Sequence, residues 1–465
     1  MIKKEKAEKL YFDALKGRAE VYNFIGRNKE ALADTNYLFT LTKIKNIKRQ
    51  EADVLMLMAN IYGSLGQFKE MQKIIEHART IYRMIKYKPG EASALITLGF
   101  LYEQFRNYQK AIAYCKFSLN ILKKTDNKIE MANAYNNLGS IYNSLRNFKE
   151  ALLFYKKALK LRRKTHDKRG ESESLNNIAF VMEDLYNYKK ALHYYKCSLK
   201  IRKEIGYKNG EAITLLNLGH LYKILGDYKK AAKYQQESAR LFKEIGNIRS
   251  LATILNNLGQ LYHLSGSSEK AIGYLEKSLT IRRKLKDISG TVYNFKNLGY
   301  CYIDLMKLSR AKKYLKQALN RANILRMRSV IPEILLGLVE IDLYQNYLEC
   351  ALEKINKTLE IANQISSKKD KGSALCALGR LYSIKNEREK AQRYFLNAID
   401  ILKKINEPFI LAKVYYYYAE NLIRNCNRAE GIIYLKKARK IFKKAGTEVW
   451  LSRVNELMTK LPKAQ

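Results

Sequence analysis

The sequence predicts an all-α solenoid of about eleven helix-turn-helix units that stack along the chain. First, the 465 residues align with themselves at a period of forty, almost without gaps. Second, apolar and small residues recur within each period at steps of three or four, which indicates one face of a helix. Third, short polar segments divide each period into two helical halves.

The repeat is defined by columns of residues that share one position in every unit. A small residue, usually glycine, forms the most regular column: Gly99, Gly139, Ala179, Gly219, Gly259, Gly299, Val339, Gly379 and Ala419. Leucine or isoleucine precedes it, tyrosine commonly follows three positions later, and alanine follows twelve positions later. A small residue allows two antiparallel helices to approach closely, so each unit is expected to be a tight hairpin.

The segments between the helical halves carry the residues expected at helix ends. The turns include Arg146-Asn147, Tyr186-Asn187 and Gly226-Asp227. Asn or Asp there is predicted to cap the second helix, and Gly to end the first. Pro89, Pro332 and Pro408 fall at the joints between units, where proline is tolerated at the start of a helix.

The composition is strongly basic, with 87 Lys and Arg against 44 Asp and Glu, and a net charge of +43. This excess favours acidic partners such as nucleic acid, anionic lipid or acidic protein. A compositional bias toward Lys, Ile, Asn and Tyr is the alternative explanation. Six cysteines are scattered without a pairing rhythm, which suits the reducing cytoplasm.

Several functional classes are not expected. The N-terminus has no apolar core typical of a secretory signal, and no apolar stretch is long enough to span a membrane. We therefore expect a soluble, cytoplasmic protein without membrane insertion. The five histidines share no metal-ligand spacing, and no phosphate-binding glycine motif is present. The sequence thus predicts a protein that is not an enzyme and has no metal, catalytic residue or cofactor.

The columns resemble the tetratricopeptide repeat, whose pattern places Leu-Gly, Tyr and two alanines at these spacings. Leu138, Gly139, Tyr142, Ala151 and Ala158 match that pattern directly. The forty-residue period and the Leu-Asn-Asn-Leu-Gly strings are similar to the long repeats of kinesin light chains and of the GoLoco-carrying polarity adaptor. The resemblance implies a right-handed superhelix in which the first helix of each pair lines a concave groove.

The regularity of the columns divides the chain into four segments. Residues 1–90 are expected to form degenerate N-terminal units, 91–330 the regular core array, and 331–445 divergent C-terminal units. Residues 446–465 are expected to form a capping helix and tail, with Trp450, Leu451, Val454 and Leu457 on one helical face. A separate functional segment from about residue 331 onward is the alternative for the divergent part.

An asparagine column is the most informative polar feature. Asn137, Asn177, Asn217, Asn257 and Asn297 occupy one position in five consecutive units, and Asn136, Asn176 and Asn256 precede three of them. Asparagine is a mediocre residue inside a helix, so a column of five asks for an explanation. In the proteins that the repeat resembles, such asparagines face the groove and bind a peptide backbone, which an amide suits as both donor and acceptor. Bridging between neighbouring helices, or an Asn-rich composition, is the alternative.

A second polar feature is basic and lies near the ends of second helices. It comprises Lys160, Arg162, Arg163, Arg202, Arg282 and Arg283. Stacked units would align these residues along one edge, which suits phosphate or acidic groups. Cations also stabilise a helix C-terminus, so a solvated edge is the alternative. Tyrosines on second helices, such as Tyr274 and Tyr314, are expected to belong to the core rather than to a base-stacking surface.

These features lead to one main hypothesis and two alternatives. The main hypothesis is an interaction scaffold that binds a protein or peptide, preferably acidic, in its groove through the asparagine column. The first alternative is a nucleic-acid-associated protein that uses the basic edge. The second is a regulatory arm of a signalling complex whose catalytic partner is another chain.

Overall fold

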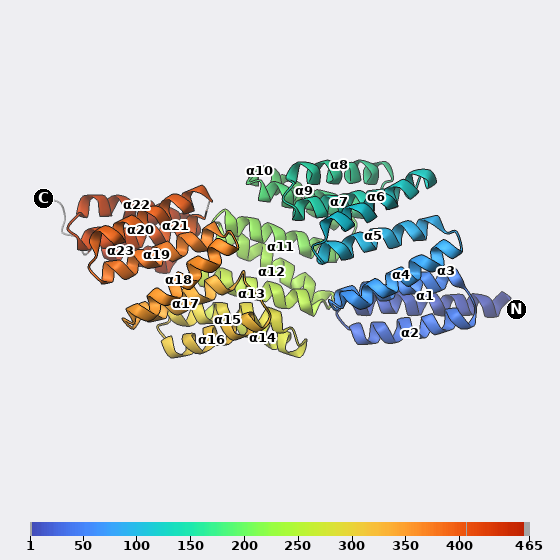
Figure 1. Ribbon diagram of the computed structural model, residues 1–465, viewed down its shortest axis with the longest axis horizontal. Helices are drawn as coiled ribbons and strands as arrows, with labels where there is room; N and C mark the ends of the chain where they lie inside the picture. The colour runs from blue at the N-terminus through green and yellow to red at the C-terminus, as the bar shows by residue number, and fades with distance from the viewer. Residues whose placement is uncertain (1, 406, 460–465) are drawn as a thin grey trace. The chain divides into compact units, whose positions relative to one another are not determined.

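The computed structural model describes residues 2–405 and 407–459, and this part of the chain contains helices and turns but no strand (Figure 1). The helices are α1 (Ile2–Phe24), α2 (Asn28–Ile44), α3 (Lys48–Ser64), α4 (Phe68–Met84), α5 (Lys88–Gln104), α6 (Tyr108–Thr125), α7 (Lys128–Ser144), α8 (Phe148–Lys164), α9 (Lys168–Asp184), α10 (Tyr188–Glu204), α11 (Lys208–Ile224), α12 (Tyr228–Glu244), α13 (Ile248–Leu264), α14 (Ser268–Lys284), α15 (Ile288–Asp304), α16 (Leu308–Ile324), α17 (Ile331–Tyr344), α18 (Leu348–Gln364), α19 (Lys368–Ile384), α20 (Arg388–Lys404), α21 (Pro408–Arg424), α22 (Arg428–Ala445) and α23 (Glu448–Thr459). The predicted all-α solenoid of helix-turn-helix units is confirmed.

The turns inside the hairpins follow the predicted chemistry. Arg146 adopts a positive φ of 57°, and the Asn147 side chain then accepts a hydrogen bond from the backbone N–H of Glu150 at 3.3 Å. Gly226 and Asp227 repeat this arrangement, and Asp227 accepts from the N–H of Lys230 at 3.0 Å. Each cap satisfies one of the amides that a helix start leaves without a partner. The predicted caps at these turns are therefore confirmed.

The glycine column allows the two helices of a hairpin to touch. A Cβ atom on Gly139 would lie 2.6 Å from a ring carbon of Tyr155. A Cβ atom on Gly259 would lie 2.5 Å from Cγ of Leu275. Such distances are shorter than van der Waals contact, so the sequence needs glycine there for close packing.

The tyrosines of the second helices lie beside the core rather than inside it. Tyr274 stacks on Tyr262 with ring centroids 5.2 Å apart, and Tyr314 stacks on Tyr302 at 5.5 Å. Both second-helix rings are only partly buried. The same half-buried position is taken by Tyr114, Tyr194, Tyr234 and Tyr434. These rings are partly buried at the edge of the core of each hairpin, so the prediction that they belong to the core holds only in part.

The chain divides into two compact units, which differ from the four segments expected from the sequence. The first unit comprises Met1–Asn217 and Leu241–Ile248, and the second comprises Leu218–Arg240 and Arg249–Gln465. This division reflects contacts between helices, whereas the boundaries expected after residues 90, 330 and 445 reflect the regularity of the repeat. Those boundaries therefore stay predictions.

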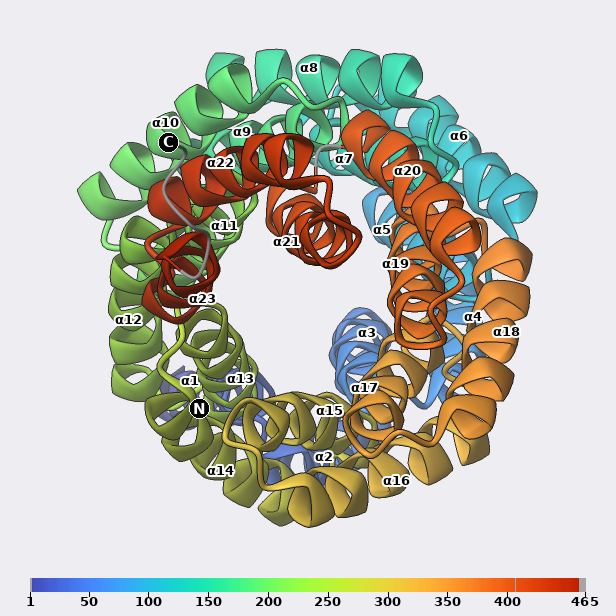
Figure 2. The ribbon, with the colours of Figure 1, turned by 90° about the vertical axis from the view of Figure 1, so that its left-hand side faces the viewer.

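The second unit brings its last helices onto its first ones. The ring of Tyr228 in α12 lies edge-on against Phe409 in α21, with centroids 6.0 Å apart. A Cβ atom on Gly266, in the turn after α13, would lie 2.7 Å from Val449 of α23. Figure 2 shows α13, α15, α17, α19 and α21 on the inner side of this unit, with α14, α16, α18, α20 and α22 outside them.

Helix α23 covers the end of the hydrophobic core of α21 and α22. Trp450 and Val454 are buried, and Leu451 and Leu457 pack against the same core. The Trp450 ring stacks on Phe442 with centroids 5.4 Å apart. The predicted C-terminal helix and its apolar face are thus present, while the predicted tail at residues 460–465 lies outside the described residues.

Candidate functional site

The inner helices of the second unit line a cavity of about 230 Å³. Helices α13, α15, α17, α19 and α21 all contribute, and the first four of them present the residue that follows the small-residue column. In the first four of these helices that residue is Gln260, Tyr300, Glu340 and Arg380. The cavity also has an apolar lining that includes Leu264, Leu336, Val339, Phe409 and Val414. A cavity lined by both polar and apolar side chains suits a ligand that has an apolar body and polar groups.

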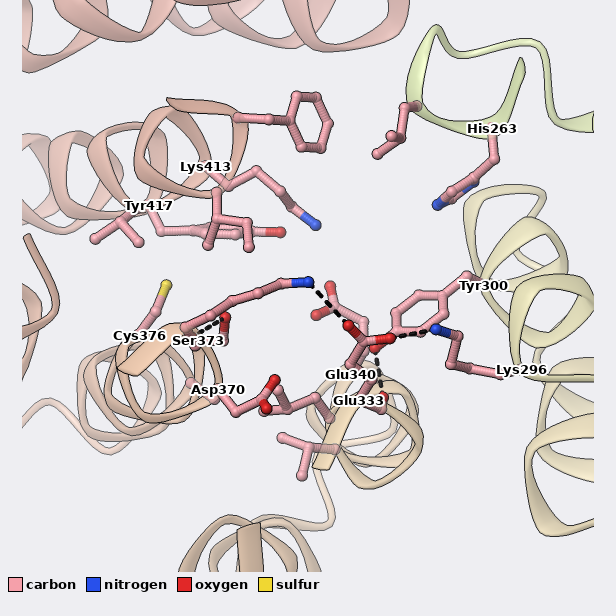
Figure 3. Close-up of a pocket in the computed structure, with 18 of the residues that line it drawn as sticks. His263, Lys296, Tyr300, Glu333, Glu340, Asp370, Ser373, Cys376, Lys413 and Tyr417 are labelled. Carbon is pink, nitrogen blue, oxygen red and sulfur yellow. Dashed lines mark hydrogen bonds and ion pairs between the residues drawn. The ribbon is translucent and has the colours of Figure 1, made fainter. Parts of the chain in front are cut away.

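Two lysines share one carboxylate on the wall of the cavity. Lys369 Nζ lies 2.9 Å from Glu333 Oε1, and Lys296 forms an ion pair with Glu333 Oε2. Burial raises the pKa of Glu333, but the two ammonium groups outweigh burial and hold the pKa below its ordinary value. Tyr300 donates its hydroxyl to the backbone carbonyl of Glu333 at 2.6 Å, and Figure 3 shows this group of side chains. Glu333 is therefore a fixed anion between two helices that each supply a lysine.

A third lysine approaches this cluster from α11. Lys223 donates to the side-chain oxygen of Gln260 at 3.1 Å. Burial, together with the nearby charges of Lys369 and Lys296, lowers the pKa of Lys223 to about 8. Burial is the main cause of this shift, because an apolar environment disfavours the charged form of an amine.

Arg380 and Glu340 form the second ion pair of the cavity. Their nearest atoms, Nη1 and Oε2, lie 2.6 Å apart, and the guanidinium also lies 4.0 Å from the ring centroid of Tyr417. Burial opposes the charge of Arg380, but Glu340 outweighs it and raises the pKa of Arg380. Lys413 and Tyr417 of α21 also line the cavity, and Figure 3 shows both side chains on the side of the cavity opposite Glu333. Among the described residues, Lys413 has a cation–π contact with Trp450, at 4.9 Å, but no ion pair.

His263 borders the same cavity at the end of α13. Its Nδ1 lies 3.0 Å from Asp304 Oδ2. Burial lowers the pKa of His263, but the Asp304 carboxylate more than offsets this and raises the pKa to about 10. His263 is therefore held as a cation at neutral pH and contributes to the positive side of the site.

A second cavity, of about 250 Å³, adjoins the first. The two cavities share Gln260, Lys296, Asn297 and Glu333. Three members of the asparagine column and its neighbour column line the second cavity, namely Asn256, Asn257 and Asn297. The cavities therefore form one trough that crosses α13, α15 and α17.

Most of the asparagine column forms bonds between neighbouring units. Asn177 donates to the side-chain oxygen of Asn136 at 2.9 Å, and Asn217 donates to that of Asn176 at 3.1 Å. Asn297 donates to Asn256 at 3.2 Å, and Asn137 donates to the carbonyl of Ile96 at 3.3 Å. These contacts match the bridging alternative for four of the five asparagines. The Asn257 side chain has no hydrogen bond within the part of the chain that the structure describes, and peptide binding by the column stays a prediction.

The predicted basic edge is only partly a surface. Lys160, Arg163 and Arg283 are exposed, but Arg162, Arg202 and Arg282 are buried, with 3%, 3% and 5% of their surfaces exposed. Arg202 donates to the carbonyl of Gly210 at 2.6 Å and to the Thr214 hydroxyl at 2.6 Å. The expectation that all six residues form one exposed edge is therefore wrong. Small residues at the start of the next helix leave room for a guanidinium, which then joins the two repeats by hydrogen bonds.

The charged residues of the cavity were missed because they form no column. Lys296, Glu333 and Lys369 occupy different positions in successive units, so the repeat pattern gives no sign that they meet. One signal was present. Lys296 stands at the position that Asn136, Asn176 and Asn256 occupy in other repeats. A charged residue therefore replaces a neutral amide at this point of the inner surface.

Two further features of the described residues concern metal ions and membranes. No group of three or more His, Cys, Asp or Glu side chains in these residues is arranged to hold a metal ion. None of the helices in the same residues is long and apolar enough to cross a membrane.

Three solved structures with a similar fold are distant from this chain in sequence. A Rap protein complexed with Competence and Sporulation Factor has a TM-score of 0.51 at 16% identity, covering 77% of this chain and 98% of that one. Aspartyl phosphate phosphatase F from Bacillus subtilis has a TM-score of 0.50 at 14% identity, with coverages of 77% and 96%. A signal transduction ATPase with a tetratricopeptide repeat sensor, from Pyrococcus horikoshii, has a TM-score of 0.50 at 20% identity. This chain is covered to 70% in that match, which spans about half (49%) of the ATPase. At these identities the likeness concerns the fold alone.

No curated protein matches the chain in sequence. A family model of the tetratricopeptide repeat matches residues 50–124, 91–164, 130–204, 170–244, 210–284 and 250–324, and a second such model matches residues 372–401. The first six windows overlap into one stretch that covers more than half of the chain. The finer resemblance to the repeats of kinesin light chains stays a prediction. The chain belongs to the tetratricopeptide repeat family.

Proposed function

We propose that this chain is a non-enzymatic interaction protein that binds a peptide or protein segment along the inner face of its second unit. The observation that carries the proposal is the trough formed by two cavities that share Gln260, Lys296, Asn297 and Glu333. A trough that crosses several helices fits an extended chain. Its apolar walls and its hydrogen-bonding groups suit the side chains and the backbone of such a segment.

Asn257 supports the proposal most directly among the asparagines. Its amide lines the second cavity and, within the described residues, has no hydrogen-bond partner. A free amide offers a donor and an acceptor to a peptide group. The Rap protein of similar fold is complexed with a factor, so this arrangement of helices is compatible with holding a partner.

Site-specific photo-crosslinking tests the proposal. A photo-reactive amino acid at Ser373 would lie in the main cavity, whereas the same amino acid at the exposed Lys313 of α16 would not. After irradiation in lysate, mass spectrometry would identify the captured segments. We expect position 373, but not position 313, to capture a discrete peptide segment, and the Asn257→Ala variant to capture less of it.

Two results would contradict the proposal. One is equal capture at both positions, which would indicate non-specific contact. The other is material that nuclease removes from the wild type and the Asn257→Ala variant alike. That result would favour the alternative of nucleic-acid binding through the exposed cations Lys160, Arg163 and Arg283.

A further inference from the structure

We infer that Lys413 and Tyr417 of α21 form a subsite for a carboxylate that is attached to a small apolar body. Both side chains line the main cavity and also a small pocket of about 40 Å³ that adjoins it. They lie on the side of the cavity opposite Glu333 (Figure 3). The inference deepens the proposed function and rests on it only for the source of the carboxylate, which is either an acidic group of the bound segment or a free organic acid.

The donor groups of these two residues are available to a ligand. Among the described residues, Lys413 Nζ has only the cation–π contact with Trp450, and the Tyr417 hydroxyl has no hydrogen bond. The other cations that line the main cavity already lie in ion pairs, namely Lys296 and Lys369 with Glu333, Arg380 with Glu340, and His263 with Asp304. Residues four positions apart share one face of a helix, so Lys413 and Tyr417 can donate to the two oxygens of one carboxylate. Binding there breaks no ion pair.

The surroundings of Lys413 favour a single negative charge over a double one. The carboxylates that face Lys413 are those of Asp304 and Glu340, which line the adjoining pocket with it. Both of them are paired with other cations, as described above. Arg453 of α23 lines the same pocket and, among the described residues, has a cation–π contact with Trp450 but no ion pair. One anion therefore matches the cations without a partner, whereas a phosphate dianion would be repelled more strongly by the two carboxylates.

The apolar lining and the size of the cavity define the body that carries the carboxylate. Leu336, Val339 and Phe409 line the main cavity and would contact carbon atoms of the ligand. At about 230 Å³, the cavity is smaller than the range of about 300–1,000 Å³ that is typical of ligand pockets. The occupant is therefore one side chain of a bound segment or an organic acid with a single ring.

Titration of the full chain with phenylacetate and phenylacetamide tests the subsite without knowledge of the partner. The two probes have nearly the same shape, and only phenylacetate carries a charge. Trp450 is the single tryptophan of the chain, so its fluorescence reports binding beside Lys413, while calorimetry measures the affinity. We expect phenylacetate to bind about tenfold more tightly than phenylacetamide and to change the fluorescence of Trp450. Absence of phenylacetate binding, equal affinity for the two probes, or unchanged fluorescence would overturn the inference.

Two variants test the two donor groups separately. Lys413→Met removes the ammonium group and should weaken phenylacetate binding about tenfold, whereas Tyr417→Phe removes only the hydroxyl and should weaken it about fivefold. The ring of Tyr417, which lies against the Arg380 guanidinium, is kept in the second variant. The matched variant Lys313→Met removes one exposed cation from the outer helix α16 and should leave the affinity unchanged. Equal affinities of all three variants would exclude Lys413 and Tyr417 as the site.

Competition separates the two sources of the carboxylate. If saturating phenylacetate abolishes capture at position 373, the bound segment supplies the carboxylate. If capture persists while phenylacetate is bound, the subsite receives a free organic acid beside the segment. Capture without any binding of phenylacetate would overturn the subsite and leave the proposed function standing. The reverse result, binding of phenylacetate without capture, would do the opposite.

Discussion

The first helices of both units follow one repeat pattern but carry different side chains after the small-residue column. In three consecutive hairpins of the first unit these side chains carry no charge, whereas two of four consecutive hairpins of the second unit carry a charged one. The residues are Phe100, Ser140 and Phe180 in the first unit, and Gln260, Tyr300, Glu340 and Arg380 in the second. Glu340 and Arg380 occupy the same position in successive units and pair at 2.6 Å.

The difference shows that the residues that stabilise a hairpin are not the residues that line the inner surface. The glycine, leucine and alanine columns hold each hairpin together and therefore recur in both units. Residues on the inner surface contribute little to the packing of the hairpin, so they can vary from one repeat to the next. Both units use polar groups to join their hairpins, and the second unit also gathers charges around a cavity.

The largest expected effect comes from breaking a buried junction of the first unit. Arg202 donates to Gly210, Thr214 and the Ser172 hydroxyl. Replacing it by Met should lower the free energy of unfolding by about 3 kcal/mol, because three buried polar groups each lose a charge-assisted hydrogen bond. Denaturant unfolding would measure the loss. The matched Lys160→Met change removes an exposed cation and should cost less than about 0.5 kcal/mol. Equal losses would show that Arg202 is not a junction.

The glycine column should respond alike in both units. Gly139→Ala and Gly259→Ala would each press a methyl group into the facing helix and should destabilise by about 2 kcal/mol. Gly273 has open space around its Cβ position, so Gly273→Ala should stabilise α14 by about 0.5–1 kcal/mol. Denaturant midpoints of the three variants would check the opposite signs, and a stabilising Gly259→Ala would contradict the close contact.

The ion pair of His263 with Asp304 gives the second unit a dependence on pH. Because the folded-state pKa is raised from 6.5 to about 10, the pair stabilises fully below pH 6.5 and loses its effect as the pH rises to about 10. The free energies of unfolding of wild type and His263→Gln should differ by about 1–2 kcal/mol at low pH. That difference should shrink toward pH 10, and a constant difference would exclude protonated His263 as the cause.

The smallest effect separates two members of the asparagine column. Asn177→Ala removes a hydrogen bond to Asn136 and should cost about 0.5–1 kcal/mol. Asn257→Ala removes no hydrogen bond among the described residues and gains helix propensity, so its stability should change by less than about 0.5 kcal/mol. Thermal or denaturant unfolding of the pair would measure this contrast. A larger loss for Asn257→Ala would mean that its amide is structural rather than free.

The sequence predicted the hairpins well because their determinants are local and repeated. Asn147 caps its helix through a residue three positions away, and Gly139 is needed by a partner within the same unit. Such features recur in every period, so the columns reveal them. The three buried arginines were predicted to be exposed, because a cation near the end of a helix is also stable in solvent. Whether such an arginine is buried depends on its contacts with the next repeat.

The candidate site depends on residues that are far apart in the chain and differ between units. Lys296 and Lys369 come from α15 and α19, and no periodic signal connects them. The sequence by itself determined the helices, the turns, the tight hairpins and the family, because these follow from spacing within forty residues. The tertiary structure alone decided which polar side chains face the cavity and which are used between helices. The physical reason is that burial and charge pairing depend on neighbours that stacking brings together across several units.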